Sequence, residues 1–162
     1  MKLYLVQHAD ALPKSENPER PLSEQGVADA VRMAAYLESV GVRVDEVVHS
    51  GKKRAEETAN ILGGAIWPGN STLEMESLGP NDSTDHLYHG AQASGGDICV
   101  VGHMPFMGRI AARLLTGAED GMNIGFTPGS VVCLERDDIG QAGPTGWHLK
   151  WMQSTENVSF SK

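Results

Sequence analysis

The sequence predicts a three-layer α/β/α fold with a mainly parallel central sheet. Short β-prone segments alternate with segments whose apolar residues recur at helical spacing, which is the pattern of strand-helix repeats. Residues 97–101 are continuously apolar after Asp97, as in a strand buried on both faces of a parallel sheet. The 162 residues suit one domain. We therefore expect a single domain over residues 1–162, with ligands at the carboxyl ends of its strands.

The first strand-helix repeat is predicted over residues 2–41. Residues 2–7 are short, apolar and β-prone, and a loop rich in proline, asparagine and charge follows them to residue 21. Ser23 is placed to cap a helix, and Gly41 to end it. The apolar positions of that helix recur at helical spacing: Val27, Ala30, Val31, Ala34, Ala35 and Leu37.

The remaining elements follow the same alternation. We expect a strand at 44–48 and a helix at 52–62, ended by Gly63 and Gly64. A short strand near 72–74 and a short helix over 85–91 precede the buried strand 97–101, and Pro105 suits the first turn of a helix that runs to Leu115. Two strands are expected in the tail, at 130–135 and 148–152, around a polar turn from Asp137 to Gly146.

The net charge of the chain argues against some classes of ligand, and the setting of its cysteines indicates their redox state. The 13 basic and 21 acidic side chains give a formal charge of −8, which argues against non-specific binding to nucleic acid or to an anionic membrane. An anionic ligand must therefore be held by a local positive site. The amino terminus does not resemble a signal peptide, so a cytoplasmic location is expected. Cys99 and Cys133 both lie in apolar runs, where buried free thiols are the expected state.

Three residues stand where the predicted fold places a ligand site. His8 follows the first strand, Arg54 lies just beyond the second, and His103 closes the apolar strand. Each of these residues alone is compatible with a structural role. Because the carboxyl ends of parallel strands meet at one edge of a sheet, their joint placement predicts a shared site.

Four short motifs contain or flank these residues. They are 6–11 (VQHADA), 20–26 (RPLSEQG), 50–58 (SGKKRAEET) and 101–105 (VGHMP). In this order and spacing, the motifs resemble those of the histidine phosphatase superfamily, also called the phosphoglycerate mutase-like family. The short length and the Arg-Pro-Leu-Ser segment are similar to its smallest members, the SixA-type phosphohistidine phosphatases. The resemblance covers residues 1 to about 115.

The resemblance implies a covalent mechanism. His8 would attack phosphorus and form a phosphohistidine intermediate that water then hydrolyses. A neutral imidazole is nucleophilic near pH 7, so neither a metal nor another cofactor is implied. Arg54 and His103 would hold the phosphoryl group and neutralise its charge, since positioning and cationic donors supply most of the catalysis of phosphoryl transfer. The planar guanidinium of Arg54 matches two phosphate oxygens at once.

The first motif departs from the pattern of most members, Arg-His-Gly. Gln7 replaces the arginine, which keeps hydrogen-bond donors but removes a charge, so we expect weaker phosphate binding without loss of the chemistry. Ala9 replaces the glycine, which matters only if the backbone there has positive φ. Arg20 is a candidate for compensating contact with the substrate phosphate, and Ser130, before a tail strand, is a further candidate donor.

The acid that protonates the leaving group in larger members has no convincing match. Asp82 lies in a plausible region, but a loop aspartate there more often forms a turn. The labile phosphorus-nitrogen bond of phosphohistidine needs less acid assistance than a phosphate ester, so the absence favours phosphohistidine. The predicted substrate is therefore a phosphohistidine-bearing protein, with inorganic phosphate as the product.

Three alternatives stay open at this point. The chain could hydrolyse a small phosphate ester, or it could be a catalytically weak module that binds phosphate without turnover, as Gln7 and the missing acid suggest. The third alternative is a metal site built from aspartates and histidines of the middle region: Asp82, Asp85, His86 and His89. The spacing of the two histidines, three positions apart, favours an exposed helix face over a metal site.

Overall fold

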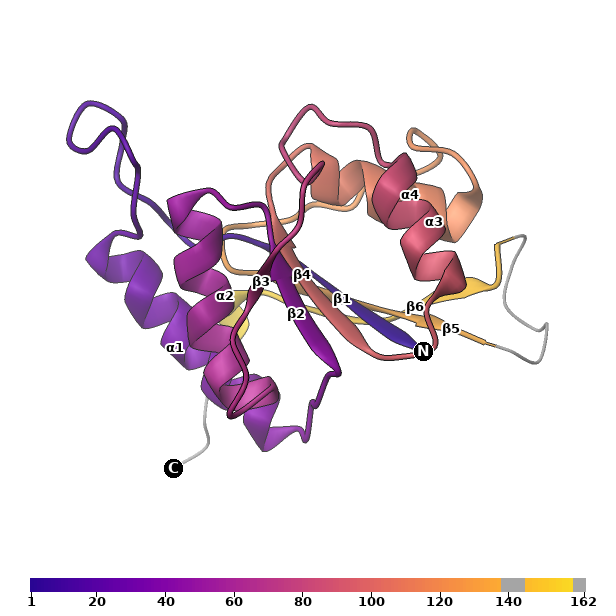
Figure 1. Cartoon of the computed structure of the whole chain (residues 1–162), viewed down its shortest axis with the longest axis horizontal. Helices are drawn as coiled ribbons and strands as arrows, with labels where there is room; N and C mark the ends of the chain where they lie inside the picture. Colours follow the sequence, from indigo (N-terminus) through magenta and orange to yellow (C-terminus); the bar gives the residue numbers. More distant parts are fainter. Residues whose placement is uncertain (138–144, 159–162) are drawn as a thin grey trace.

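A computed structural model describes residues 1–137 and 145–158 (Figure 1). The elements in chain order are β1 (Lys2–Gln7), α1 (Glu24–Ser39), β2 (Glu46–His49), α2 (Lys53–Ile66), β3 (Leu73–Glu74), α3 (Asp85–Ala93), β4 (Ile98–Gly102), α4 (Phe106–Thr116), β5 (Val131–Arg136), β6 (Trp147–Gln153) and the 3₁₀ turn η1 (Thr155–Asn157). The predicted polar turn between the tail strands lies partly outside the described residues, at 138–144.

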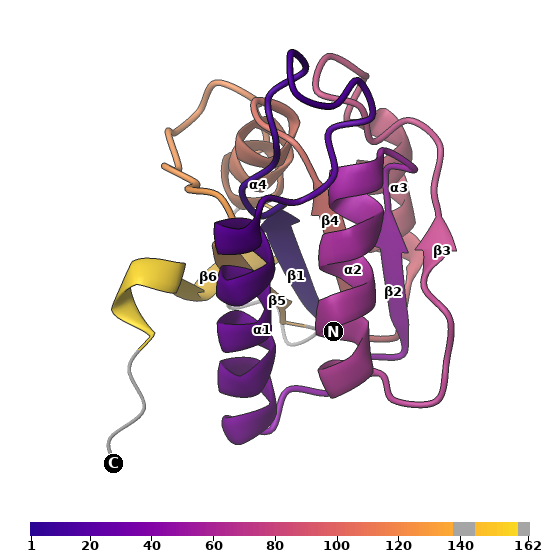
Figure 2. The same cartoon turned by 90° about the vertical axis from the view of Figure 1, so that its left-hand side faces the viewer.

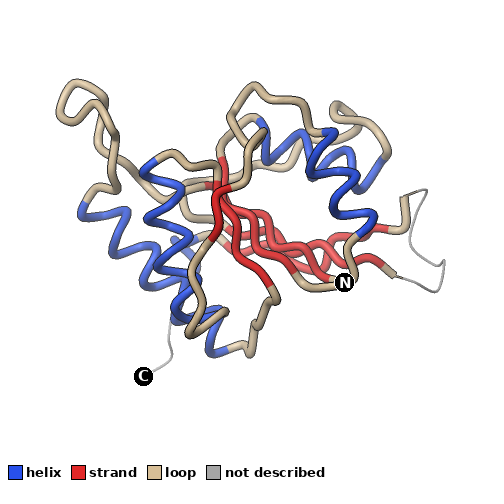
Figure 3. The backbone as a smooth tube through the Cα atoms, in the orientation of Figure 1, coloured by secondary structure: helices blue, strands red, loops and turns tan. Residues whose placement is uncertain are grey.

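The strands form one sheet in the order β3-β2-β4-β1-β5-β6. Parallel pairing joins β3, β2, β4 and β1, whereas β5 runs antiparallel to both of its neighbours. Helices lie on both sides of this sheet (Figure 3). The predicted α/β/α architecture with a mainly parallel sheet is confirmed.

The alternation of side chains along the strands explains the two helical layers. In β1, Tyr4 and Val6 face the core shared with α1 and α2, and Leu3 and Leu5 face the core shared with α3 and α4. Because both faces of the central strands are buried, their sequences are almost continuously apolar. Figure 2 shows α1 and α2 side by side on one face of the sheet and α4 on the other.

Helix α1 confirms its predicted ends but not all of its predicted core. Ser23 caps it by accepting a hydrogen bond from the Gly26 N–H, and Gly41, with φ of 74°, follows its last turn. Val27 and Val31 were expected on its apolar face, yet their side chains are 43% and 54% exposed. Apolar residues that recur with the helical period of 3.6 form a stripe along one side of a helix. The two valines lie at the margin of this stripe, where they face solvent rather than α2 and the sheet.

Helix α2 is longer than predicted. The expected stop at Gly63 and Gly64 is wrong, since the helix continues to Ile66. Ile66 is fully buried, and a Cβ added at Gly63 would lie only 3.1 Å from the Thr72 side chain. Burial of Ile66 offsets the low helix propensity of the glycines, and Gly63 allows close packing of the segment that leads into β3.

Two further expectations concern the whole chain. Cys99 and Cys133 are buried free thiols, as predicted. None of the helices within the described ranges is long and apolar enough to cross a membrane.

Candidate active site

The carboxyl ends of three adjacent parallel strands bring the site together. In sheet order these strands are β2, β4 and β1, and each is followed by a polar residue: Ser50 after β2, His103 after β4 and His8 after β1. The His8 N–H donates a hydrogen bond to the carbonyl of Gly102 over 3.0 Å. The sheet therefore fixes the backbone of His8 against the strand that delivers His103.

Two hydrogen bonds fix the tautomer of His8. Its Nδ1 lies 2.7 Å from the carbonyl oxygen of Ala9, which can only accept, so Nδ1 carries the proton. The Nε–H of Arg54 donates to the Nε2 of His8 over 3.1 Å. The imidazole is thus neutral with its lone pair on Nε2. Burial is the main reason that its pKa falls to about 4, and the positive charges of Arg54 and Arg20 lower it further.

Arg54 reaches His8 from the first turn of α2. Thr58, one turn further along this helix, donates from its hydroxyl to the Arg54 carbonyl and accepts from the Ala9 N–H at 3.0 Å. The Thr58 side chain is 1% exposed, so this bridge between α2 and the chain after His8 is buried. The Thr58 bridge beside the site and the direct hydrogen bond between Arg54 and His8 therefore both keep these two residues together.

His103 packs against the same group. Its side chain is almost fully buried, and its ring centroid lies 5.0 Å from that of His8, with a 58° angle between the rings. Its Nε2 is 2.6 Å from the hydroxyl oxygen of Ser50. Burial is the largest cause of a pKa lowered to about 3, followed by the charges that His8 and Arg54 would contribute. His103 is therefore neutral near pH 7, and its buried Nδ1 has no hydrogen-bond partner within the described residues.

Arg20 adds a second guanidinium to this site. It lies on the loop between β1 and α1 with φ of 53°, and its Nε donates to the Leu12 carbonyl over 3.1 Å. After burial, the charge of Arg20 is a further cause of the lowered pKa values of His8, Arg54 and His103. The structure thus brings together the local positive site that a chain of net charge −8 needs for an anionic ligand.

The loop that carries Arg20 is tied down at its far end. Ser23 donates from its N–H to the Asp10 carbonyl over 3.0 Å and from its hydroxyl to the Asp10 carboxylate. A Cβ at Gly26 would lie 1.9 Å from the Asp10 carbonyl oxygen, so only glycine permits this approach of α1. Glu57 of α2 accepts from the Leu22 N–H over 2.7 Å. The motif at residues 20–26 therefore anchors the loop as well as supplying Arg20.

The two departures from the usual first motif have different consequences. Ala9 does not have positive φ, so its Cβ fits the backbone without strain. Gln7 ends β1 beside Gly102, and its buried Oε1 has no hydrogen-bond partner in the described ranges. Because position 7 holds glutamine and not arginine, a buried neutral acceptor lies where an arginine would supply a charged donor.

Ser130 lies against the end of β1, beside Gln7. It is fully buried, and its hydroxyl oxygen accepts a hydrogen bond from the Thr127 N–H over 3.0 Å. Its carbonyl accepts from the Gln7 N–H at 3.3 Å, so Ser130 closes the loop before β5 against the end of β1. The hydroxyl accepts the hydrogen bond from Thr127 and keeps its own proton, so its role as a phosphate donor stays a prediction.

Asp82 is also used structurally. Its carboxylate accepts from the Gly79 N–H over 2.7 Å, and its carbonyl accepts from Arg109 on α4. Among the described residues Asp82 forms no hydrogen bond with His8 or His103, and its contacts are those of a turn residue. The four residues drawn as a possible metal site do not meet, since no group of three or more histidine, cysteine, aspartate or glutamate side chains in the described chain could hold a metal ion.

Comparisons with known proteins bear on the family and the fold of this chain. The model of the histidine phosphatase superfamily, branch 1, matches residues 3–74, which contain Gln7, His8, Arg20 and Arg54. The resemblance to the histidine phosphatase superfamily is confirmed. His103 lies beyond the segment that the superfamily model matches.

Individual relatives of this superfamily extend the match to the whole chain. The phosphohistidine phosphatase SixA of Escherichia coli K12 is 25% identical over 167 residues, which cover 100% of this chain and 99% of the relative. A structure of the protein histidine phosphatase SixA with tungstate superimposes with a TM-score of 0.83 at 23% identity and covers 98% of this chain and 100% of that one. The structure of a putative phosphohistidine phosphatase SixA from Agrobacterium tumefaciens superimposes with a TM-score of 0.73 at 22% identity and covers 94% of this chain and 97% of that one. The two solved structures support the fold.

Sequence reasoning missed two residues of the site. Ser50 and Thr58 both lie in the motif at residues 50–58 that also contains Arg54. Their signal was present in the spacing, because Thr58 lies one helical turn after Arg54 and Ser50 follows a strand end. Only the tertiary structure shows that they contact His103 and Ala9.

Proposed function

We propose that the chain is a phosphohistidine phosphatase in which His8 is the nucleophile. The observation that carries the proposal is the neutral His8 imidazole, whose Nε2 lone pair lies beside the Arg54 guanidinium and whose ring packs against His103. A nucleophile needs an available lone pair, and a transferring phosphoryl group needs cationic donors around its oxygens. The Nε2 lone pair of His8 meets the first requirement, and the adjacent guanidinium of Arg54 meets the second.

The proposed reaction has two steps. In the first, Nε2 of His8 forms a bond to phosphorus, the bond to the leaving nitrogen breaks, and that nitrogen keeps the electron pair and takes a proton from solvent. In the second, water attacks the phosphorus, inorganic phosphate leaves, and the imidazole recovers its lone pair while the proton passes to solvent. Arg54 exchanges its bond to Nε2 for bonds to phosphoryl oxygens, and Arg20 adds charge.

His103 and Ser50 form the other wall of the site in this proposal. Ser50 donates its hydroxyl proton to Nε2 of His103, which places the His103 proton on the unpartnered Nδ1. That N–H then donates to a phosphoryl oxygen. A buried donor without a protein partner is costly in the free protein, and a bound phosphoryl group removes that cost.

The substrate class follows from what the site lacks. Asp82, the sequence candidate for a general acid, is engaged in its own turn. An imidazole leaving group departs from phosphorus without a strong dedicated acid, whereas an ester oxygen does not. The name of the E. coli relative, a phosphohistidine phosphatase, agrees with this substrate. The net charge of −8 supports a protein partner over nucleic acid or an anionic membrane.

A comparison of rates tests the proposal. Phosphate release is measured from a phosphohistidine-bearing protein domain and from phosphoserine and sugar phosphates at equal concentrations. We expect the wild type to prefer phosphohistidine, and His103→Asn to reduce its turnover by about 100-fold. His89→Asn, an exposed histidine on α3, is the matched control and should retain full activity. Faster hydrolysis of an ester would contradict the proposed phosphohistidine substrate. Unchanged turnover by His103→Asn would contradict the proposed role of His103.

Gln7 motivates one alternative, a module that binds phosphate without turnover. Its buried, unpartnered Oε1 supplies no charge to a phosphoryl group. Gln7→Arg distinguishes the two functions, because a restored guanidinium should tighten binding of inorganic phosphate by about 1 kcal/mol, or roughly fivefold. If both forms hydrolyse phosphohistidine, the binding-module alternative fails. If only Gln7→Arg does so, the native site is a degraded one.

A further inference from the structure

A cavity lies between the sheet and α3, on the face of the sheet that α3 and α4 cover. Its floor consists of Leu3, Ile98 and Glu46, which lie side by side near the amino ends of β1, β4 and β2. His8, Ser50 and His103 follow the carboxyl ends of the same strands. The cavity has a volume of about 240 Å³, and none of the residues that line it belongs to the site described above.

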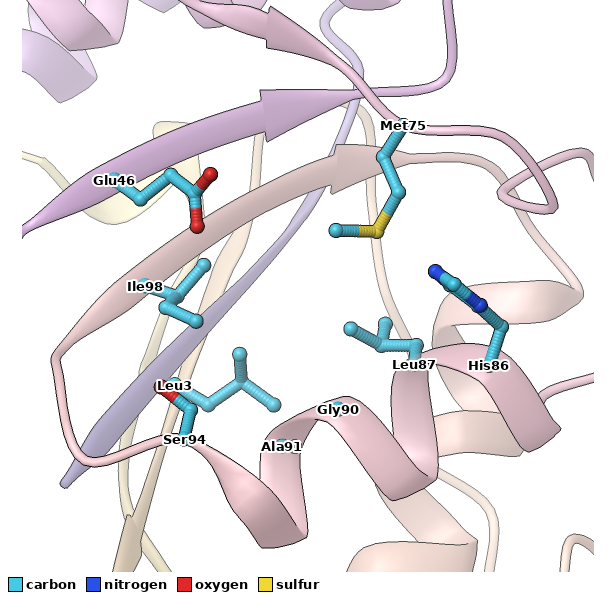
Figure 4. Close-up of a pocket in the computed structure, with 9 residues that line it drawn as sticks. All are labelled: Leu3, Glu46, Met75, His86, Leu87, Gly90, Ala91, Ser94 and Ile98. Atoms are coloured by element: carbon cyan, nitrogen blue, oxygen red, sulfur yellow. The ribbon is translucent and has the colours of Figure 1, made fainter.

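Helix α3 forms the opposite wall of this cavity. Leu87, Gly90 and Ala91 come from the helix, and Met75 closes the space from the segment after β3. Figure 4 shows the Met75 thioether and the Glu46 carboxylate pointing into the space, with Leu87 and Leu3 across from them. The Met75 N–H donates to the His49 carbonyl over 2.8 Å, which holds this wall against β2. The cavity is thus mainly apolar, with few polar groups at its margin.

Glu46 supplies the carboxylate of this cavity, and the other ionisable side chain that lines it is the imidazole of His86 on α3 (Figure 4). The Glu46 side chain has no hydrogen-bond or ion-pair partner in the described part of the chain, although other carboxylates nearby in sequence are paired. A neutral ligand that covered this carboxylate would remove it from water and return at most an uncharged hydrogen bond, and an anion would be repelled. A cation beside Glu46 offsets the desolvation. The ligand that fits therefore has a positive end and an apolar body.

The volume sets the size of that body. An apolar cavity of about 150 Å³ binds benzene, and sites for drug-sized ligands begin at about 300 Å³. The space between β4 and α3 thus suits one aromatic ring or a short branched aliphatic chain, joined to the charged group by a short linker. We propose that this cavity is a binding site for a small primary amine with an aromatic or branched aliphatic body, its ammonium group paired with Glu46.

Gly90 gives the proposal a variant that adds a side chain at the wall of the cavity. A Cβ added at this residue meets nothing within 4 Å, so a larger side chain enters open space and also improves the helix. Gly64 of α2 has the same freedom outside the cavity and supplies the matched control. For the charge, Glu46→Gln keeps the shape, and Glu38→Gln on the exposed end of α1 is its control.

The test uses 2-phenylethylamine as the probe and 2-phenylethanol as its neutral counterpart. Methyl NMR with labelled methionine follows Met75 while each compound is titrated into the full chain. We expect the amine to shift the Met75 methyl signal, Gly90→Leu to abolish that shift, and Glu46→Gln to weaken binding at least fivefold. Gly64→Leu and Glu38→Gln should bind as the wild type does, and cooperative melting at or above the wild-type temperature would show that all variants fold.

Three results would overturn the proposal. One is the absence of any Met75 shift with the amine at millimolar concentration. Another is equal binding of the alcohol, or of the amine to Glu46→Gln, since the carboxylate would then play no part. The third is an equal loss of binding in Gly64→Leu, which would place the ligand elsewhere. Phosphatase activity is not a readout here, so these outcomes stand apart from those that test His8.

Discussion

The Nε–H of Arg54 donates a hydrogen bond to the Nε2 of His8 over 3.1 Å, although 46 positions separate the two residues in the chain. Because Nδ1 of the same ring donates to the Ala9 carbonyl, the nitrogen beside the guanidinium is the one with the lone pair. The group that neutralises a phosphoryl oxygen and the group that attacks phosphorus are therefore adjacent before any substrate arrives. The predictions below follow from this arrangement and from the residues that hold it.

Replacement of Arg54 by lysine separates charge from geometry. Lysine keeps a positive charge but has neither the Nε–H that contacts His8 nor the planar fork that binds two oxygens. We expect Arg54→Lys to lower kcat by about 100-fold on phosphohistidine with little effect on the melting temperature. Steady-state kinetics with Lys53→Arg as the control measure this effect. A rate close to that of the wild type would show that charge alone suffices.

Ser50 is expected to act through His103. Ser50→Ala removes the 2.6 Å contact to Nε2 and frees the imidazole to change tautomer, so we expect kcat to fall roughly tenfold while KM changes little. Ser50→Thr retains the hydroxyl and should recover most of the rate. Imidazole ¹⁵N shifts of His103 report the tautomer directly. Identical tautomer populations in wild type and Ser50→Ala would refute the positioning role.

Acid should destabilise the fold through the two site histidines. Burial lowers the pKa of His8 to about 4 and that of His103 to about 3, both below the unfolded value of 6.5. Between those values the unfolded chain binds more protons than the folded one, so the free energy of unfolding falls as the pH drops from about 6.5 towards 4. Urea unfolding across this range measures the slope. His8→Asn should flatten it and His89→Asn should not; an equal slope in all three proteins would contradict the assigned pKa values.

Two helical glycines are expected to respond in opposite ways to alanine. A Cβ at Gly26 would overlap the Asp10 carbonyl, so Gly26→Ala should destabilise the protein by about 1–3 kcal/mol and move the loop that carries Arg20. Gly64 has open space around it, and Gly64→Ala should stabilise the protein by up to about 1 kcal/mol. Thermal unfolding compares the two. Equal effects would mean that the approach of α1 to Asp10 is not constrained.

The sequence predicted the parts of this molecule that local patterns encode. The apolar run that became β4 and the cap at Ser23 are local signals, and the placement of His8 and His103 followed from the rule that parallel strands end at one edge. The predicted stop at Gly63 failed, because tertiary burial of Ile66 outweighs a propensity of about 1 kcal/mol per glycine.

Contacts between distant segments lay beyond the sequence. No local pattern shows that the Ser50 hydroxyl lies against His103 or that Thr58 bridges Arg54 and Ala9. The engagement of the Ser130 hydroxyl with Thr127 was equally invisible, since a serine before a strand is compatible with either use. Hydrogen-bond partners depend on side-chain direction, which the periodicity of a sequence does not specify beyond a face.

The most direct test of the central claim is to trap the intermediate on His8. Wild type and His8→Ala are mixed with a radiolabelled phosphohistidine substrate, quenched in alkali and examined for protein-bound label. The account predicts label that is stable to alkali and lost in acid on the wild type alone, together with release of phosphate. Equal phosphate release by His8→Ala would contradict the mechanism, and neither label nor release from the wild type would contradict the proposed activity.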